Sequence, residues 1–317
     1  MSGQITPLDA LDAADAHIRA TPELEHTLSL LVAHHEETVF ERYYGQAGPD
    51  DLHAVHSITK SVVSTLVGIV AADGLTLDTP VAALVPAPAF SAEPAKRAIT
   101  VRHLLTMTSG LDSSGRWDLD EIVERGEPWV ESALAAPLVA EPGSTFTYSN
   151  GACHVLSAVV EAVAGKPTAD VADERLFRPL GISRWQWEAD PEGRSDAAGG
   201  LRLAPRDLLK LGQLSLGRGR WDGARVVDEG YLRTATSALG PGGPPERCSY
   251  GMLWWVADGA ATPLHFGGGW GGQYLLVAPE LDLVVLTTGD AYAGPRALGM
   301  LLRKLAIETV MAAFLAR

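Results

Sequence analysis

A serine and a lysine, Ser57 and Lys60, stand three residues apart at the start of a long apolar stretch. On a helix they would lie one turn apart on the same face, where a hydroxyl and an amine can share a hydrogen bond. Such an amine can accept the serine proton and make the hydroxyl a nucleophile without a histidine. Lys60 is also the only charged residue between Ser57 and Ala72. Because burying an unpaired ammonium is costly, Lys60 must be paired, reach solvent through a cleft, or lose its proton.

This S-x-x-K pattern also has an ordinary structural explanation. Serine and lysine are common residues, and the tetrad usually marks the solvated start of a helix. In this chain it occurs once, and its lysine falls in an apolar segment of helical periodicity. Chemistry at Ser57 therefore depends on partners elsewhere in the chain.

A second group of polar residues, Tyr148 and Asn150, stands in a turn-rich stretch before a helix that we expect to begin near His154. From such a loop both side chains can project into a cleft. Asn150 is the only asparagine in the protein. The alternative is a simple β-turn, since Tyr-Ser-Asn-Gly is a good turn sequence that needs no chemistry.

A third stretch, residues 264–274, is rich in glycine and lies between two predicted strands. Glycines beside a strand indicate a backbone edge that a substrate can approach closely, with N–H groups available to bind an oxyanion. The alternative is a flexible hairpin loop. The stretch formally matches G-x-G-x-x-G, but a strand follows where a dinucleotide-binding fold needs a helix.

The elements that must position these residues follow from the periodicity of apolar positions. An amphipathic helix over 8–20 is followed by two strands, and then by the apolar helix that contains Lys60. Helical periodicity dominates from 100 to about 180, and strand-like runs return near the end of the chain before a last helix from 296 to about 315. The predicted strands are 28–34, 38–44, 250–256, 274–277 and 283–288.

This order predicts an α+β fold, in which an antiparallel sheet built from both chain ends is flanked by helices and carries an inserted all-helical lobe. We expect residues 1–75 and 201–317 to form the α/β lobe and residues 76–200 the helical lobe, within a single domain overall. The active cleft is expected where the two lobes meet.

The three motifs, in this order, resemble the serine β-lactamase and penicillin-binding protein superfamily, and in particular the class C β-lactamases and the esterases, amidases and acyltransferases of the same fold. Ser57-Ile58-Thr59-Lys60 resembles the S-x-x-K motif, Tyr148-Ser149-Asn150 the Y-x-N motif, and His265-Phe266-Gly267 a variant of the K-T-G strand. The resemblance covers most of the chain, including residues 101–111 and 274–280, which are typical of this branch.

The resemblance implies a role for each of these residues. Ser57 would attack an ester or amide carbonyl and hold the acyl group covalently. Lys60 and Tyr148 would share the work of the general base, as a neutral amine or as a phenolate stabilised by the ammonium, and Tyr148 would protonate the leaving group. Asn150 would hydrogen-bond Lys60 or a substrate amide. The backbone N–H groups of Ser57 and Gly268 would form the oxyanion hole.

The third motif departs from the β-lactamase pattern. A lysine there would be a permanent cation facing a substrate carboxylate, whereas His265 is mostly neutral at pH 7 and a weaker anion anchor. The register is also open. Alignment backward from residues 272–274 puts Gly267-Gly268-Gly269 on the motif, which would make Trp270 the oxyanion donor and His265 a bystander.

These considerations predict a serine hydrolase, an esterase or amidase, that acts through an acyl-enzyme on a small ester or amide. Three alternatives remain: an acyltransferase using the same acyl-enzyme, a β-lactamase or D-Ala-D-Ala peptidase, and a non-catalytic binding protein of the same fold. The substituted third motif and the absence of an export signal argue against cell-wall peptides and antibiotics as substrates.

Composition excludes several other classes of function. The formal net charge of −14 argues against nucleic acid or an anionic membrane as a partner, since both require a basic surface. The sequence shows neither a signal peptide nor an apolar run long enough for a membrane span, so we expect a cytoplasmic protein. No H-E-x-x-H pattern or cysteine cluster indicates a metal site, and no cofactor is expected. We leave open whether the chain forms a homo-oligomer.

Overall fold

The computed structural model describes residues 6–315, which form two compact units. The first, here called the sheet unit, comprises the described residues up to Ile58, Arg202–Gly217 and the described residues from Ala257 onward. The second, the helical unit, comprises Thr59–Leu201 and Arg218–Val256. Residues 59–75 and 218–256 thus cluster with the helical unit, whereas we expected them in the α/β lobe.

The sheet unit begins and ends with helices and has its strands between them. Its helices and helical turns are α1 (Pro7–Ala20), η1 (Pro22–Leu24), α9 (Pro205–Leu216), η6 (Pro279–Leu281), α11 (Leu298–Leu305), η7 (Ala306–Met311) and α12 (Ala312–Leu315). Its strands are β1 (Thr27–His34), β2 (Glu37–Tyr43), β3 (His53–Ala54), β11 (Leu264–Gly269), β12 (Gln273–Ala278) and β13 (Leu283–Gly289). Strand β5 (Leu201–Leu203) starts at the unit boundary and pairs with β3.

The helical unit is built mainly from short helices. They are α2 (Ile58–Ala71), η2 (Val81–Ala83), α3 (Ala89–Ala92), η3 (Pro94–Ala98), α4 (Val101–Leu105), η4 (Gly115–Trp117), α5 (Leu119–Glu124), α6 (Trp129–Ala135), α7 (Asn150–Ala164), α8 (Thr168–Ala172), η5 (Asp173–Phe177) and α10 (Glu229–Ala235). Its strands are β4 (Trp185–Trp187), β6 (Arg220–Trp221), β7 (Ala224–Arg225), β8 (Gly240–Gly243), β9 (Cys248–Tyr250) and β10 (Trp255–Ala257).

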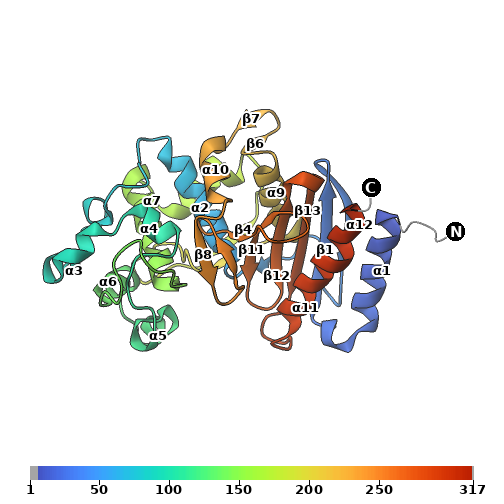
Figure 1. The fold of residues 1–317 in the computed structure, drawn as a ribbon, viewed down its shortest axis with the longest axis horizontal. Helices are drawn as coiled ribbons and strands as arrows, with labels where there is room; N and C mark the ends of the chain where they lie inside the picture. The colour runs from blue at the N-terminus through green and yellow to red at the C-terminus, as the bar shows by residue number, and fades with distance from the viewer. Residues whose placement is uncertain (1–5, 316–317) are drawn as a thin grey trace. The chain divides into compact units, whose positions relative to one another are not determined.

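The sheet joins the two ends of the chain, as the sequence predicted (Figure 1). Within the sheet unit the strand order is β2-β1-β13-β12-β11, and every neighbouring pair is antiparallel. Leu31 of β1 pairs with Leu286 of β13, and Val284 of β13 pairs with Val277 of β12. All residues of β12 and β13 are buried. Strands with that pattern need a covering layer on both faces.

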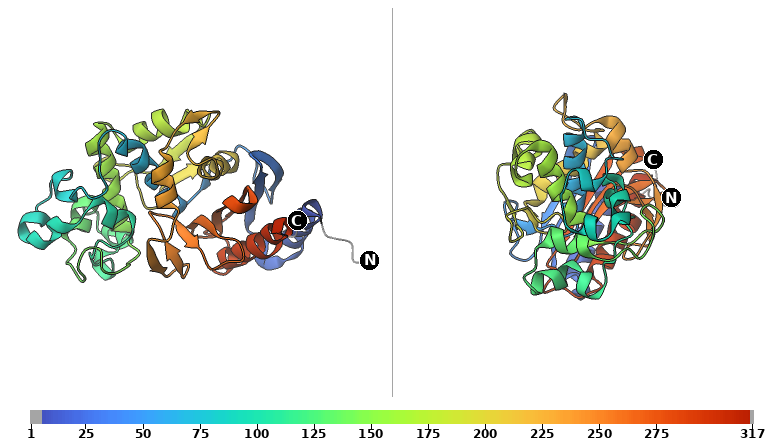
Figure 2. Two further views of the ribbon diagram at one scale, coloured as in Figure 1. Left: turned by 45° about the horizontal axis from the view of Figure 1, so that its top comes forward. Right: turned by 90° about the vertical axis from the view of Figure 1, so that its left-hand side faces the viewer.

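Helices supply these two layers (Figure 2). Successive residues of a strand point to opposite faces, so Leu275 and Tyr274 of β12 mark the two sides. Gly212 of α9 lies against Leu275, and Gly299 of α11 lies against the Tyr274 hydroxyl. Helix α9 therefore covers one face, while α11 covers the other and continues into η7, which packs against α1.

Several predicted boundaries shift in the structure. The first two strands begin one residue earlier than predicted, and β2 ends one residue earlier. His35 and Glu36 both have positive φ, at 50° and 67°, which is the geometry of a tight hairpin turn. The predicted strand 250–256 is wrong as a single element, because the chain turns between β9 and β10, with Leu253 at a φ of 58°. The last helix is interrupted by the π-helical turn η7.

Helix α2 forms the apolar centre of the helical unit. Its residues from Thr59 to Val70 are all buried, and they include Lys60 and the hydroxyl side chains of Thr59, Ser61, Ser64 and Thr65. Gly68 lets α10 pack closely, because a Cβ at this position would lie 2.5 Å from the Tyr231 ring. The Tyr231 hydroxyl donates a hydrogen bond to the Ser64 carbonyl at 2.8 Å. These contacts explain why α2 clusters with the helical unit.

Among residues 6–315, no helix has both the length and the apolar character that a membrane span requires.

Packing of α9 on the sheet can be tested with Gly212→Ala. The new Cβ would lie 2.5 Å from Val284 Cγ1 and 2.9 Å from Leu275 Cδ1. Because both neighbours are buried, we expect overpacking to reduce the free energy of unfolding by about 1–3 kcal/mol in a urea titration. Gly299→Ala is the matched control, since its Cβ would approach no atom closer than 3.4 Å. It should be neutral or stabilise by up to about 1 kcal/mol. Equal effects of the two changes would contradict this packing.

Candidate active site

Ser57 lies in a turn that ends where α2 begins. The Ile58 N–H donates to the Val55 carbonyl at 3.1 Å and closes this turn. His56, directly before the serine, has a φ of 47°, in the left-handed region that few residues other than glycine adopt. Such backbone strain persists only where the surrounding structure holds it. Ser57 itself is half-buried. The strained turn therefore presents the serine at a fixed point of the sheet unit.

The end of strand β11 packs against this turn. A Cβ on Gly269 would lie 2.6 Å from the Val55 carbonyl oxygen and 3.0 Å from Gln273 Cβ. The glycines of this stretch were expected to allow a close approach by a substrate. At Gly269 the backbone that approaches is the protein's own, two residues before Ser57. The sheet unit thus brings the third motif and the serine turn together.

Two exposed aromatic side chains are attached to these segments. Trp270 follows Gly269, is 58% exposed, and donates a hydrogen bond from Nε1 to the Ala291 carbonyl at 3.2 Å. Tyr292 is 87% exposed, and its ring centroid lies 5.8 Å from that of His56. Tyr292 therefore contacts the turn that carries Ser57, and Trp270 directly follows Gly269, which packs against that turn.

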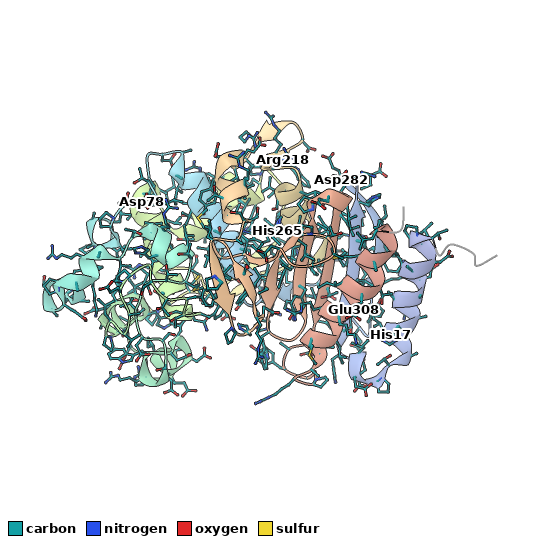
Figure 3. All side chains as sticks on the ribbon, in the orientation of Figure 1. His17, Asp78, Arg218, His265, Asp282 and Glu308 are labelled. Carbon is teal, nitrogen blue, oxygen red and sulfur yellow. The ribbon has the colours of Figure 1, made fainter. Side chains whose placement is uncertain are left out.

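His265 is buried in β11 (Figure 3). Its Nε2 lies 2.8 Å from the Ser215 hydroxyl of α9, and only 5% of the residue is exposed. Burial lowers the pKa of His265 to about 3, so the side chain is neutral at pH 7. A neutral imidazole bonded to α9 supplies no cation to a substrate. This placement favours the register in which His265 is a bystander and Trp270 stands beside the site.

Gly267 and Gly268 lie within the β11–β12 hairpin. They pair with Leu275 and Tyr274, and both are buried. The turn of the hairpin comes later, at residues 270–272. Their role as oxyanion donors stays a prediction.

Lys60 lies in the first turn of α2 and is almost completely buried, with 1% exposed. Its Nζ donates a hydrogen bond to the Ala198 carbonyl at 2.6 Å. The same Nζ lies 5.0 Å from the centroid of the Tyr148 ring, within the range of a cation–π contact. The sequence required Lys60 to be paired, to reach solvent or to lose its proton. In the structure it is paired. The helical unit brings Lys60 and Tyr148 together.

An aromatic cluster holds the Tyr148 ring. It stacks on Trp255 of β10, with centroids 5.8 Å apart and planes 16° from parallel. Tyr250 contacts the Trp255 ring edge-on at 4.6 Å, and Phe146 contacts Tyr250 at 5.1 Å. The sequence offered no means of selecting Trp255, among the tryptophans of the chain, as the one that supports Tyr148.

Asn150 is the first residue of α7, which begins four residues before the predicted start near His154. The reason is Ser149, whose hydroxyl accepts a hydrogen bond from the Ala152 N–H at 3.0 Å and caps the helix. The Ser149 N–H also donates to the Met107 sulfur at 3.4 Å. The middle residue of the Tyr-Ser-Asn motif therefore anchors the two residues beside it.

The predicted site residues are divided between the two units. The sheet unit contains Ser57, His265, Gly267, Gly268 and Trp270, and the helical unit contains Lys60, Tyr148 and Asn150. Sequence reasoning missed the Ala198 carbonyl because a backbone acceptor leaves no signature in residue type.

The burial of His265 makes a prediction about stability and pH. The pKa of an unfolded histidine is about 6.5. Below that pH the unfolded chain takes up a proton that the folded chain refuses down to about pH 3, so falling pH favours unfolding in this window. His265→Gln can keep a bond to Ser215 but does not titrate. In urea titrations between about pH 6.5 and pH 4, we expect wild type to lose up to about 1.4 kcal/mol more per pH unit than the variant.

His17→Gln, on the exposed face of α1, is the control for loss of a surface histidine (Figure 3). Parallel pH profiles of wild type and the His265 variant would show that His265 takes up its proton equally in both states.

Comparison with known proteins places this geometry in a family. A family model described as Beta-lactamase matches residues 14–304. The 6-aminohexanoate-dimer hydrolase of Paenarthrobacter ureafaciens is 26% identical, over 89% of this chain and 78% of that protein. Esterase EstB of Burkholderia gladioli is 34% identical, over 48% of this chain and 44% of that protein.

The fold also resembles that of solved structures. EstCE1, described as a hydrolase with promiscuous acyltransferase activity, superposes with a TM-score of 0.75 at 19% identity, over 96% of this chain and 98% of that one. The family model spans most of the chain, and the fold agrees with it. The protein therefore belongs to the beta-lactamase family, within a serine hydrolase superfamily that includes amidases and esterases.

Proposed function

We propose that the protein is a serine hydrolase that cleaves a small ester or amide through an acyl-enzyme. One observation carries this proposal. The buried Lys60 places its Nζ beside both the Ala198 carbonyl and the Tyr148 ring, one helical turn after Ser57. A purely structural core position would be filled at lower cost by an apolar side chain. A lysine that contacts a tyrosine and follows three residues after a serine on a strained turn supports a nucleophile with its base.

The proposed reaction uses three side chains. Lys60 and Tyr148 act as one coupled base that takes the Ser57 proton while Oγ attacks the carbonyl carbon. Backbone N–H groups of Ser57 and of either Gly268 or Trp270 hold the oxyanion. The C–O or C–N bond then breaks, and the leaving group takes a proton from Tyr148. Water attacks the acyl-serine through the same base and releases the carboxylic acid and free Ser57.

Charge around the third motif supports the choice of substrate class. His265 is buried and its low pKa keeps it neutral, so it offers no permanent cation to a substrate carboxylate. Penicillins and D-Ala-D-Ala peptides carry such a carboxylate, whereas simple esters and amides need none. The relatives named as a 6-aminohexanoate-dimer hydrolase and as an esterase support amides and esters. Acyl transfer remains the second candidate, since it differs only in the acceptor that reaches the acyl-enzyme.

Labelling with a serine-directed fluorophosphonate tests the nucleophile. We expect intact wild-type protein to gain the mass of one phosphonyl group and peptide mapping to locate it on Ser57, because an activated serine attacks phosphorus as it attacks a carbonyl. Ser57→Ala should gain no mass. Ser91→Ala, which removes an exposed serine of α3, is the matched control and should label like wild type. Unlabelled wild type would support the non-catalytic alternative, whereas label retained in Ser57→Ala would show that the reactive nucleophile is another residue.

A substrate panel tests the reaction class. Short p-nitrophenyl esters and anilides should be hydrolysed with a higher kcat/KM than a chromogenic cephalosporin, because His265 offers no cation to the cephalosporin carboxylate. Faster turnover of the cephalosporin would mean that the substrate assignment is wrong. Amine and alcohol acceptors added to the ester reaction, with product analysis by mass spectrometry, separate hydrolysis from acyl transfer.

A further inference from the structure

We propose that His154 is a positioning residue for Lys60, acting through the backbone of Ala197 and Ala198. This role rests on the proposed function, in which Lys60 takes part in removing the proton of Ser57. All the residues that carry it lie in the helical unit, and His154 belongs to none of the sequence motifs.

His154 is completely buried on α7, one turn after Asn150. Its Nε2 lies 2.9 Å from Asp190 Oδ2, and its Nδ1 accepts a longer hydrogen bond, of 3.4 Å, from the Ala197 N–H. A backbone N–H can only donate, so Nδ1 must carry no hydrogen. The hydrogen of the ring is then on Nε2 and points to Asp190. Both bonds together fix which ring nitrogen donates and which accepts.

The surroundings of Asp190 make it an acceptor for the hydrogen bond from His154. Its other oxygen, Oδ1, accepts from the N–H groups of Glu192 at 3.0 Å and Arg194 at 2.8 Å. Burial acts to raise the pKa of Asp190, but the bonds from His154 and from the Arg194 backbone outweigh it and lower the pKa. Asp190 is therefore a carboxylate without a hydrogen of its own to donate. The loop that carries it fixes the hydrogen of His154 on Nε2.

The backbone after Asp196 connects this pair to Lys60. Cys153, next to His154 on α7, donates from Sγ to the Ala197 carbonyl at 3.4 Å. Burial raises the pKa of the Cys153 thiol to about 12, so the thiol keeps the hydrogen that it donates. Helix α7 thus holds the N–H and the carbonyl of Ala197 through two adjacent side chains. The next carbonyl, that of Ala198, accepts the Lys60 hydrogen bond at 2.6 Å.

The charges that face these groups are mostly acidic. Asp196 Oδ1 accepts from the Ala198 N–H at 2.8 Å and lies 3.9 Å from His154 Nδ1. Glu161, Glu192 and Arg194 interact electrostatically with Asp190 or His154 at longer range. Asp120 and the Cys153 thiol interact electrostatically with Lys60. A shift of the Ala198 carbonyl would therefore change how Lys60 is oriented among these groups.

Two amide variants of His154 separate the two bonds. His154→Asn places an amide oxygen near the position of Nδ1, where it can accept from the Ala197 N–H, but it is too short to reach Asp190. His154→Gln places an amide nitrogen near the position of Nε2, where it can donate to Asp190, but it leaves the Ala197 N–H without its acceptor. Each variant is neutral and polar, so the pair is matched in charge and chemistry.

The readouts are the rate of Ser57 phosphonylation from about pH 5 to pH 10, kcat and KM on a turned-over ester, and thermal stability. We expect His154→Gln to slow labelling and kcat by about 10- to 100-fold, with a shifted pH midpoint and little change in KM, because the base is misplaced while binding is retained. His154→Asn should stay close to wild type in rate and pH midpoint, even if its melting temperature falls.

Asp190→Asn tests the tautomer. An amide nitrogen facing Nε2 would require Nε2 to accept, which moves the ring hydrogen to Nδ1 and sets it against the Ala197 N–H. The variant should therefore slow labelling as His154→Gln does. In the His154→Asn background the same change should have no further effect on rate. ¹⁵N chemical shifts of His154 should show the hydrogen on Nε2 in wild type and on Nδ1 in Asp190→Asn.

The outcomes distinguish this proposal from the proposed function. Labelling of Ser57 in wild type, with the same pH midpoint and rate in both His154 variants, would overturn the positioning role alone and leave His154 as a structural residue. Equal losses in both variants at an unchanged midpoint would overturn it as well. A wild-type protein that is never labelled and turns over no substrate would overturn the proposed function, and the positioning role with it.

Discussion

The burial of one amine governs much of the helical unit. Lys60 is 1% exposed inside a buried helix that has no other charged residue, so its Nζ must find every partner within the protein. A buried cation left without partners would cost several kcal/mol, far more than the same side chain costs at the surface. Lys60 has two kinds of partner: the Ala198 carbonyl accepts a hydrogen bond from Nζ, and the face of the Tyr148 ring lies beside Nζ. The Ala198 carbonyl and the Tyr148 ring must therefore be held in place around Nζ, whatever the function of Lys60.

The two units place their residues by different means. In the helical unit, side chains position one another: Trp255 supports Tyr148, and α7 carries both the Ser149 cap and the Cys153–His154 pair. In the sheet unit, backbone conformation positions the residues. Ser57 follows a left-handed residue, and its turn is held against β11 by a contact that only a glycine allows. Substitutions near Ser57 are thus limited by backbone conformation, and those near Lys60 by side-chain packing.

The antiparallel sheet built from both chain ends and the buried helix α2 could be predicted, because apolar periodicity of two or of 3.6 residues is written in the sequence itself. Four candidate site residues could be selected because they are polar residues in motifs that follow one another in a known order: Ser57, Lys60, Tyr148 and Asn150. The partners of Lys60 and Tyr148 could not be predicted. A backbone carbonyl such as Ala198 has no identity in sequence, and the Trp255 contact joins residues 107 positions apart. The start of α7 was misplaced because a serine inside a motif was not read as a cap.

The pairing of β1 with β13 has a consequence for how the chain is made. Thr27 pairs with Gly289, so β1 is synthesised long before the strand with which it pairs. Between the end of β2 at Tyr43 and the start of β13 at Leu283 the ribosome adds 240 residues, which takes about 10–50 s at bacterial and eukaryotic elongation rates. During that time the apolar edge of β1 has no strand to pair with and can join other chains. The nascent chain therefore exposes this strand edge until β13 has been made.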